Sequence, residues 1–226
     1  MDPSSEIGVV AVRVSRLDAD GTPDFNNAIG AFMLCGGLSS FEYDFDNDEG
    51  EDVFVKDAGG LACVNFKRQD IMKRVTFTLT LCRSDVRLEE ILLGANAEIL
   101  TELGDPAGIV YKAASACGTP IVNNGVAIEL WSERIDCNAP DADFPYARYV
   151  MPRAYLTPAA GTLDESVREH QYVGYGVVNN NFDDGPFGDL DQLVGVTNWP
   201  IGKVFDTAVP TCPVPIGYIP TPSPVS

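Results

Sequence analysis

The stretch RVTFTLTLCRSDVRLEEILL, residues 74–93, decides the fold class of this chain. In its first half, apolar residues alternate with threonines. The apolar set is Val75, Phe77, Leu79 and Leu81, and the polar set between them is Thr76, Thr78 and Thr80. Alternation with a period of two is typical of a β-strand with one apolar and one polar face. The first half of the stretch therefore predicts a half-buried strand.

The second half of the same stretch predicts a helix. Ser84 occupies the position of an N-cap, and Asp85 falls in the first turn, where negative charge is favourable. Gly94 marks a break or an early C-cap. The apolar residues that recur at helical spacing are Leu88, Ile91, Leu92, Ala95 and Ile99.

Composition limits the classes of function that are open to the chain. It has 226 residues, of which 45% are hydrophobic, and this suffices for a core without a metal or disulfide staple. Fifteen basic and 33 acidic residues give a formal charge of −18, which argues against binding phosphates or anionic membranes. No apolar run approaches the roughly 20 residues that span a bilayer, and the acidic N-terminal start lacks the features of a signal peptide. We therefore expect synthesis in the cytosol.

The cysteines do not form a recognisable metal or redox motif. None of them stands in a C-x-x-C pair, so their spacing fits neither a zinc site nor a thioredoxin-like site. We expect several, such as Cys63 and Cys82 inside apolar runs, to be buried reduced thiols that act as small hydrophobes.

Further strands and a proline-rich tail complete the expected architecture. The prolines beyond Asp206 predict an extended or disordered C-terminal arm at 206–226, which leaves a β domain at 1–205. Pro152 interrupts one strand in a way that suits an edge strand or a bulge. The other expected strands include residues 9–16, 126–131, 146–156 and 172–178. The predicted fold is mainly β with one flanking α-helix.

One predicted strand carries a row of carboxylates. Its aromatic residues Phe41, Tyr43 and Phe45 alternate with its acidic residues Glu42, Asp44 and Asp46. We expect the aromatic residues to face the core and the carboxylates to make the opposite face strongly negative. The acidity continues in a segment that has the composition of a mobile loop, although a solvated hairpin fits it equally. That segment consists of Asp48, Glu49, Gly50, Glu51 and Asp52.

Motifs that would indicate an enzyme are missing from the sequence. It contains no G-x-S-x-G, no P-loop and no H-E-x-x-H, and the glycines at 174 and 176 lack the third glycine of a dinucleotide loop. His170, the single histidine, lies in a polar run and is expected to be an exposed loop or strand-end residue. Asp18 and its neighbours fit an Asp-Gly turn better than a calcium loop. We therefore expect no catalytic, cofactor or metal site.

The order of these elements resembles the major tail tube protein of long-tailed, siphovirus-type bacteriophages. The likeness covers about residues 8–205. It rests on the acidic strand and loop at 41–60, on Val75-Thr-Phe-Thr-Leu-Thr-Leu81 followed by the helix from Asp85 to Gly94, and on Ala127-Ile-Glu-Leu-Trp131-Ser. The resemblance implies a small β-sandwich or barrel with a flanking helix. Strand edges of neighbouring subunits then join into one continuous barrel.

The resemblance also implies a function. Six such subunits form a ring, and rings stack into the hollow tail tube through which DNA is delivered. The expected partners are further copies of the chain, the tape measure protein, and the tail terminator and distal tail proteins. DNA passes through without specific binding, and no membrane is involved. The expected location is the tail of the virion, after assembly in the host cytoplasm.

Two hypotheses about residues follow from this likeness. Glu42, Asp44 and Asp46 are candidates for the lumen or its rim, because a lumen that lets DNA slide should repel phosphate. The threonine face of Thr76, Thr78 and Thr80 competes with them for that role. The segment from Asp48 to Asp52, within a loop at 48–60, is expected to become ordered on contact with the adjacent ring.

Other classes of protein stay open at this point. A head decoration protein, a tail terminator or a secretion-system tube would share the acidity and the β content. A carbohydrate-active β-sandwich enzyme would require a cleft with convergent carboxylates.

Overall fold

The fold is described by a computed structural model. It covers residues 5–24, 30–36, 38–56, 58–59, 62–82, 85–103, 105–112, 123–136, 139–141, 143–159, 169–211 and 217–219. No helix within these ranges is long and apolar enough to cross a membrane.

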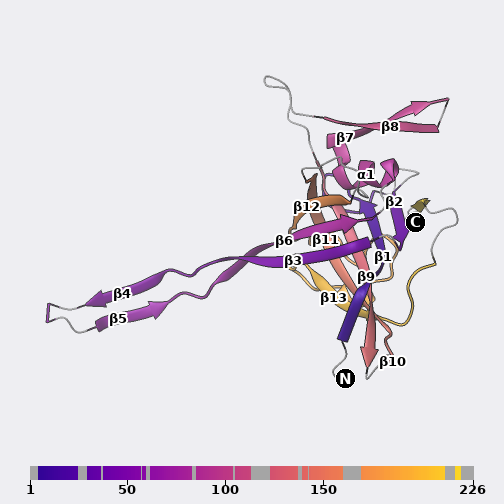
Figure 1. The fold of residues 1–226 in the computed structure, drawn as a ribbon. Helices are drawn as coiled ribbons and strands as arrows, with labels where there is room; N and C mark the ends of the chain where they lie inside the picture. Colours follow the sequence, from indigo (N-terminus) through magenta and orange to yellow (C-terminus); the bar gives the residue numbers. More distant parts are fainter. Residues whose placement is uncertain are drawn as a thin grey trace.

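A large antiparallel sheet forms the body of the molecule (Figure 1). Its strands lie in the spatial order β14, β2, β1, β9, β11, β12, β6 and β3, with β10 paired to β9 and β13 paired to β11. Their bounds are β14 Gly217–Ile219, β2 Ala31–Cys35, β1 Ser5–Arg16, β9 Val126–Asp136, β11 Tyr146–Pro158, β12 His170–Gly176, β6 Ile71–Leu81, β3 Leu38–Asp48, β10 Ala139–Pro140 and β13 Gly202–Asp206.

Two hairpins lie outside this sheet. β4 (Asp52–Lys56) pairs with β5 (Ala62–Lys67), and β7 (Ala97–Glu102) pairs with β8 (Asp105–Tyr111). A mainly β fold with one helix, α1 (Val86–Leu93), is thus confirmed. Within the described residues the sheet does not close into a barrel, because β3 is paired only to β6.

The predicted strand at 75–81 is confirmed as the inner part of β6. Val75, Phe77, Leu79 and Leu81 are all at most 4% exposed. They pack with α1 and with apolar residues of β1, β2, β9 and β11 in the main core. Burying a side chain of this size contributes about 1.5–3 kcal/mol, so this alternating pattern is a principal source of the stability of the fold.

The helix and its early C-cap at Gly94 are confirmed, but its N-cap differs from the prediction. Asp85 is the N-cap, since its Oδ1 accepts a hydrogen bond from the backbone N–H of Arg87 at 2.8 Å. Ser84 lies outside the described residues. Gly94 ends the helix with φ of 55°, a backbone conformation that favours glycine. Ile99, expected on the helix, therefore lies in β7, and the chain passes to it through the 3₁₀ turn Gly94–Asn96.

A loop at 177–201 covers the opposite face of the sheet. Phe182 and Leu190 from this loop are buried against Ala127, Val150 and Val204. Beside this cluster, the buried side chain of Trp131 donates a hydrogen bond from Nε1 to Asp206 Oδ2 at 2.8 Å. Trp131 is thus a core residue rather than an exposed platform for ligands.

The bulge predicted at Pro152 is confirmed. The register between β11 and β9 shifts between Met151 and Ala154. β11 is nevertheless a central strand, with neighbours on both sides, because Pro152 lies at the point where the ladder is interrupted and no hydrogen bond from its nitrogen is needed.

The cysteines do not behave as predicted. Cys63 and Cys82 are free, but both are exposed. Cys63 lies on β5, where residues 63–67 are all exposed, and Cys82 follows the last residue of β6. Cys35 at the end of β2 is disulfide-bonded.

In the C-terminal arm, Gly217–Ile219 pair with β2 as β14.

Candidate functional site

The acidic row of β3 and the threonine row of β6 form a single surface. Glu42 lies directly opposite Thr78, and Asp44 lies directly opposite Thr76. Directly opposed residues of antiparallel strands project to the same face. The two candidates for a lumen-facing surface are therefore one face of the sheet. Thr80, which lies opposite Ser40, is buried and does not belong to the exposed part of that face.

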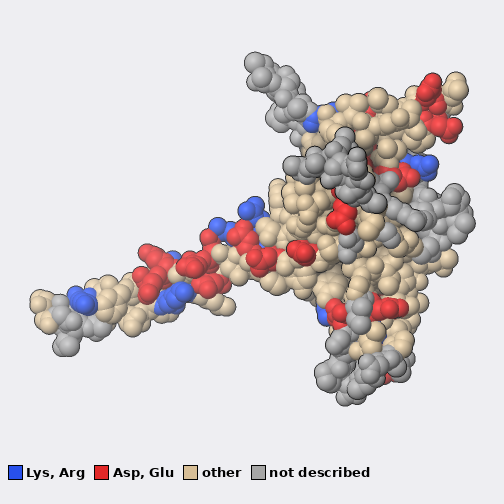
Figure 2. All heavy atoms as spheres, in the orientation of Figure 1, with Lys and Arg blue, Asp and Glu red and all other residues tan. Residues whose placement is uncertain are grey.

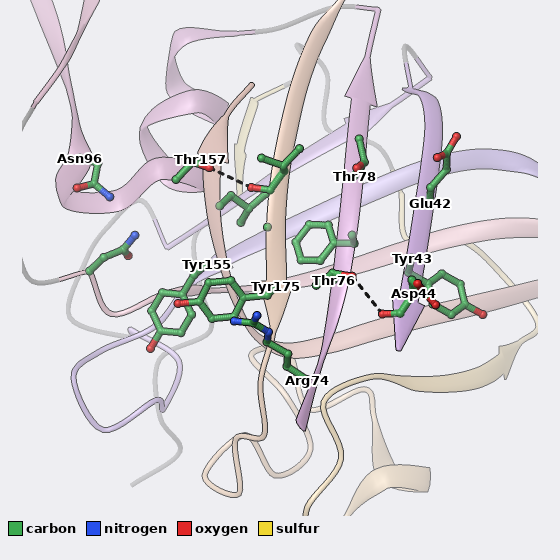
Figure 3. A pocket seen from close by; sticks show the side chains of 15 residues that line it. Glu42, Tyr43, Asp44, Arg74, Thr76, Thr78, Asn96, Tyr155, Thr157 and Tyr175 are labelled. Carbon is green, nitrogen blue, oxygen red and sulfur yellow. Dashed lines mark hydrogen bonds between the residues drawn. The ribbon is translucent and has the colours of Figure 1, made fainter. Parts of the chain in front are cut away.

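This face is hollowed. The hollow has a volume of about 750 Å³ and is open to solvent (Figure 3). β12 and β11 extend it beyond β6, because Val173 lies opposite Thr78 and Tyr175 lies opposite Thr76, with Thr157 and Tyr155 in the next row. Asn96 and Asn123 line it as well. We call the whole concave region the polar hollow.

Two tyrosines and an arginine form one wall of the polar hollow. The rings of Tyr155 and Tyr175 have centroids 5.4 Å apart, and the Arg74 guanidinium lies 5.2 Å from the Tyr175 ring (Figure 3). Arg74 Nε also donates a hydrogen bond to Asp46 Oδ2 at 2.7 Å. Of the three predicted acids, Asp46 is thus neutralised by a cation of its own chain.

The other two acids are not paired with a cation among the described residues. Asp44 Oδ1 accepts a hydrogen bond from the backbone N–H of Phe45 at 2.8 Å. Glu42 is exposed, and no described residue forms an ion pair with it. The negative charge of the polar hollow therefore resides on Glu42 and Asp44.

Gly174 sits on the floor of the polar hollow and allows β11 and β12 to approach closely. A Cβ at this position would lie 2.4 Å from the backbone oxygen of Tyr155 and 2.9 Å from Cζ of Phe77. Both distances are too short for real atoms, and the first involves backbone that cannot move aside easily. Glycine is thus required by the packing.

The aromatic face of β3 is only partly the core that was predicted. Phe41 packs against Phe77, with ring centroids 5.8 Å apart. Tyr43 and Phe45 are 42% and 45% exposed, so their assignment to the core was wrong. The reason is the position of β3, which is the last strand of the sheet and carries its far end away from the body (Figure 1).

The acidic segment after β3 lies within a long hairpin rather than at its tip. Asp48 ends β3, Asp52 begins β4, and Glu49, Gly50 and Glu51 connect the two strands. We call residues 46–56 and 62–74 the long hairpin. It projects from the body, with acidic and basic side chains side by side along its near half (Figures 1 and 2).

Contacts across the long hairpin hold this segment in place. Lys73 Nζ lies 2.5 Å from Asp48 Oδ1, and the backbone N–H of Gly50 donates to Asp70 Oδ1 at 2.9 Å. The backbone N–H of Arg68 donates to the carbonyl oxygen of Glu51 at 3.0 Å. These contacts are those of a solvated hairpin, and a change of order on contact with an adjacent ring stays a prediction.

The outer half of the long hairpin carries an uncovered apolar face. Val53 lies opposite Phe66, and Val55 lies opposite Val64, so all four side chains share one side. Val55, Val64 and Phe66 are 47%, 43% and 58% exposed.

No catalytic arrangement is found at the remaining candidate residues. His170 begins β12, as predicted for a strand-end residue, and its Nδ1 lies 3.4 Å from Glu89 Oε1. Asp18 closes a turn, where the hydroxyl of Thr22 donates to Oδ2 at 2.7 Å and holds the pKa of Asp18 below its usual value. Within the described ranges, no group of three or more potential ligands could hold a metal ion.

Sequence reasoning missed the tyrosine wall of the polar hollow. Tyr175 comes from β12, which pairs with β6 across a long sequence separation, and Tyr155 comes from β11, which pairs with β12. Nothing in the local pattern of either strand shows which residues of the neighbouring strand it faces.

Comparisons with known protein families and with curated proteins found no match to this chain. Its function therefore has to be inferred from the polar hollow, the long hairpin and the distribution of charge.

Proposed function

We propose that this chain is the structural subunit of a viral tail tube, in which hexameric rings stack into a hollow conduit for DNA. The observation that carries the proposal is the long hairpin with its uncovered apolar face. A subunit that must hold its neighbours needs such a projecting contact.

The long hairpin lacks the support that an isolated hairpin needs. Two strands alone are marginally stable in water, and they usually require a further strand or a packed layer. Here the face of Val53, Val55, Val64 and Phe66 has neither within the described chain. Exposed apolar surface of this kind is typical of a protein–protein contact. A neighbouring subunit in the same ring or in the adjacent ring would supply it, with Asp48–Asp52 beside the contact.

The polar hollow supports the assignment of a lumen face. DNA that must slide is retarded by each cation that binds a phosphate, because every such contact adds affinity. Glu42 and Asp44 offer carboxylates, the threonines beside them are uncharged, and Arg74 in the same lining is paired with Asp46. We assign the face of Glu42, Asp44, Thr76 and Thr78 to the channel wall.

The open edge of the sheet supports ring closure. The outer edge of β3 has no hydrogen-bonded strand beside it among the described residues. Such edges normally favour unwanted pairing, and closure into a barrel removes them. In the proposed ring the sheets of neighbouring subunits join at these edges. The tape measure protein, the tail terminator and the distal tail proteins would contact the completed tube in the virion.

Negative-stain electron microscopy of the concentrated pure protein tests this function. We expect rings or open tubes with a central channel. A matched variant, Val64→Ser with Phe66→Ser, removes half of the apolar face without touching the core, so it should stay monomeric and keep the melting temperature of the wild-type monomer. Wild-type protein that remains monomeric at every concentration and salt condition would refute the proposal.

A further inference from the structure

We infer that the long hairpin has one acidic and one basic edge, and that the acidic edge of one copy joins the basic edge of the next copy. This inference rests on the proposed function and deepens it, because it names the contact that gives the assembly its direction. The occupant of each edge is a second copy of this chain.

The two strands of the long hairpin, taken together with its base at the sheet, differ in charge. One strand is acidic and the other is mainly basic. The strand that runs outward, residues 42–52, contains seven acidic residues and no basic one. The strand that returns, residues 67–74, contains four basic residues and one acidic one. The acidic set is Glu42, Asp44, Asp46, Asp48, Glu49, Glu51 and Asp52, and the basic set is Lys67, Arg68, Lys73 and Arg74.

Both edges are free to accept a further strand. β4 and β5 pair only with each other, so each has one open side among the described residues. On the returning strand, Ile71 and Arg74 pair with β3 alone, because the contact of β12 with β6 begins at Val75. An added strand would therefore meet unpaired backbone groups on either side of the long hairpin.

Pairs within the chain leave much of this charge in water. Lys67 and Arg68 have side chains that are 57% and 68% exposed, and that of Glu51 is 70% exposed. Glu51 and Arg68 approach only to 4.0 Å, and Lys67 Nζ lies 3.9 Å from Asp70 Oδ1. These side chains remain available to a neighbour of opposite sign. Lys73 and Arg74, in contrast, are closely paired with Asp48 and Asp46 and contribute less to the basic edge.

The sorting determines which edges can meet. Opposite charges on adjacent strands are favourable, whereas like charges directly opposite each other are unfavourable. Two acidic edges or two basic edges would repel, so a symmetric contact between identical edges is disfavoured. The remaining contact is head-to-tail, the type that forms closed rings or open filaments.

Charge reversal on one edge at a time tests this inference. Variant one carries Glu49→Lys and Glu51→Lys, and variant two carries Lys67→Glu and Arg68→Glu. At low salt we expect each variant to assemble at least about tenfold more slowly than the wild type, as followed by light scattering. At about 1 M salt the difference should largely disappear, because the charges are screened over a few ångströms.

Combining the variants distinguishes a contact between copies from a pair within one chain. An equimolar mixture of variants one and two should assemble with alternating subunits, because each basic edge then meets an acidic one. The pair between Glu51 and Arg68 stays broken in both chains, so recovery cannot come from its repair. A single chain that carries all four substitutions should assemble within about twofold of the wild type.

A control variant carries the same change of charge on a different hairpin of the chain. Glu98→Lys with Glu102→Lys alters the β7–β8 hairpin and should leave assembly unchanged. If variants one and two assemble like the wild type at low salt, or if their mixture does not recover, the inference is overturned while tube formation by the wild type still supports the proposed function. If the wild type itself never assembles, that result contradicts both the inference and the proposed function.

Discussion

Arg13 and Glu129 form a bidentate pair in the interior of the protein. Arg13 Nε donates to Glu129 Oε1 at 2.8 Å, and Arg13 Nη2 donates to Oε2 at 2.6 Å. The two residues are opposite each other on β1 and β9, and their side chains are 4% and 0% exposed. Burial alone would lower the pKa of Arg13, but the carboxylates of Glu129 and Asp189 outweigh it and raise the pKa. The pair also fastens the 177–201 loop, because Arg13 Nη2 contacts Asp189 Oδ2 at 2.9 Å.

Removing the charge of Glu129 should destabilise the protein strongly. Glu129→Gln leaves the buried guanidinium groups of Arg13 and Arg148 without their shared carboxylate. Breaking a buried pair in this way costs about 3–5 kcal/mol, which urea unfolding of the monomer would measure. Glu51→Gln, at an exposed pair, should cost less than about 1 kcal/mol. If Glu129→Gln lowered the free energy of unfolding by less than about 1 kcal/mol, the pair would not hold the loop.

Gly174→Ala should also destabilise the protein. The new Cβ would meet the backbone oxygen of Tyr155 at 2.4 Å, so β11 and β12 would have to move apart. Overpacking of this kind costs about 1–3 kcal/mol and should lower the melting temperature by several degrees. Gly108→Ala is the matched control, because nothing lies within 4 Å of its added Cβ. Equal melting temperatures for the two variants would contradict the close approach of the strands.

Reversing the charge of the polar hollow should slow the passage of DNA. In virions that carry Glu42→Lys with Asp44→Lys, we expect tubes of normal length and at least tenfold slower release of DNA, because lysines in the channel bind phosphate. Asp46 is left unchanged, since it is already paired with Arg74. The neutral variant Glu42→Gln with Asp44→Asn is the control and should release DNA at nearly the normal rate. Normal release from the lysine variant would remove this face from the channel wall.

Tyr149 should make the protein less stable at alkaline pH. Burial and the hydrogen bond that its hydroxyl donates to Glu6 raise the pKa of Tyr149 above its usual value near 10. The unfolded chain therefore loses this proton at a lower pH than the folded chain does. The stabilisation is complete below about pH 10 and declines as the pH rises further. Unfolding at pH 8 and pH 11 should show a smaller decline for Tyr149→Phe than for the wild type, and an identical decline would exclude this contribution.

The strand and helix at 74–93 were predictable because both depend on local periodicity. Val75 to Leu81 alternate without interruption, and Leu88, Ile91 and Leu92 recur with the period of a helix. The end of the helix was less clear, since Ile99 continues the apolar spacing. The left-handed backbone at Gly94 determines that end, and the sequence marks it only as one of two possibilities.

The candidate site was only partly predictable, because it depends on the register between distant strands. The rows of Glu42 and Thr78 were recognised separately, but their meeting on one face follows from the pairing of β3 with β6. The exposure of Phe45 depends on the position of β3 at the end of the sheet. Local alternation shows that a strand has two faces, whereas the order of strands determines which face is covered.

Cryo-electron microscopy of the assembled protein tests the central claim most directly. A reconstruction at a resolution that shows side chains would locate Glu42 and Asp44 in the assembly. We predict stacked rings with a continuous central channel and both carboxylates on its wall. Solid filaments, or tubes in which these carboxylates face the outer surface, would contradict the account.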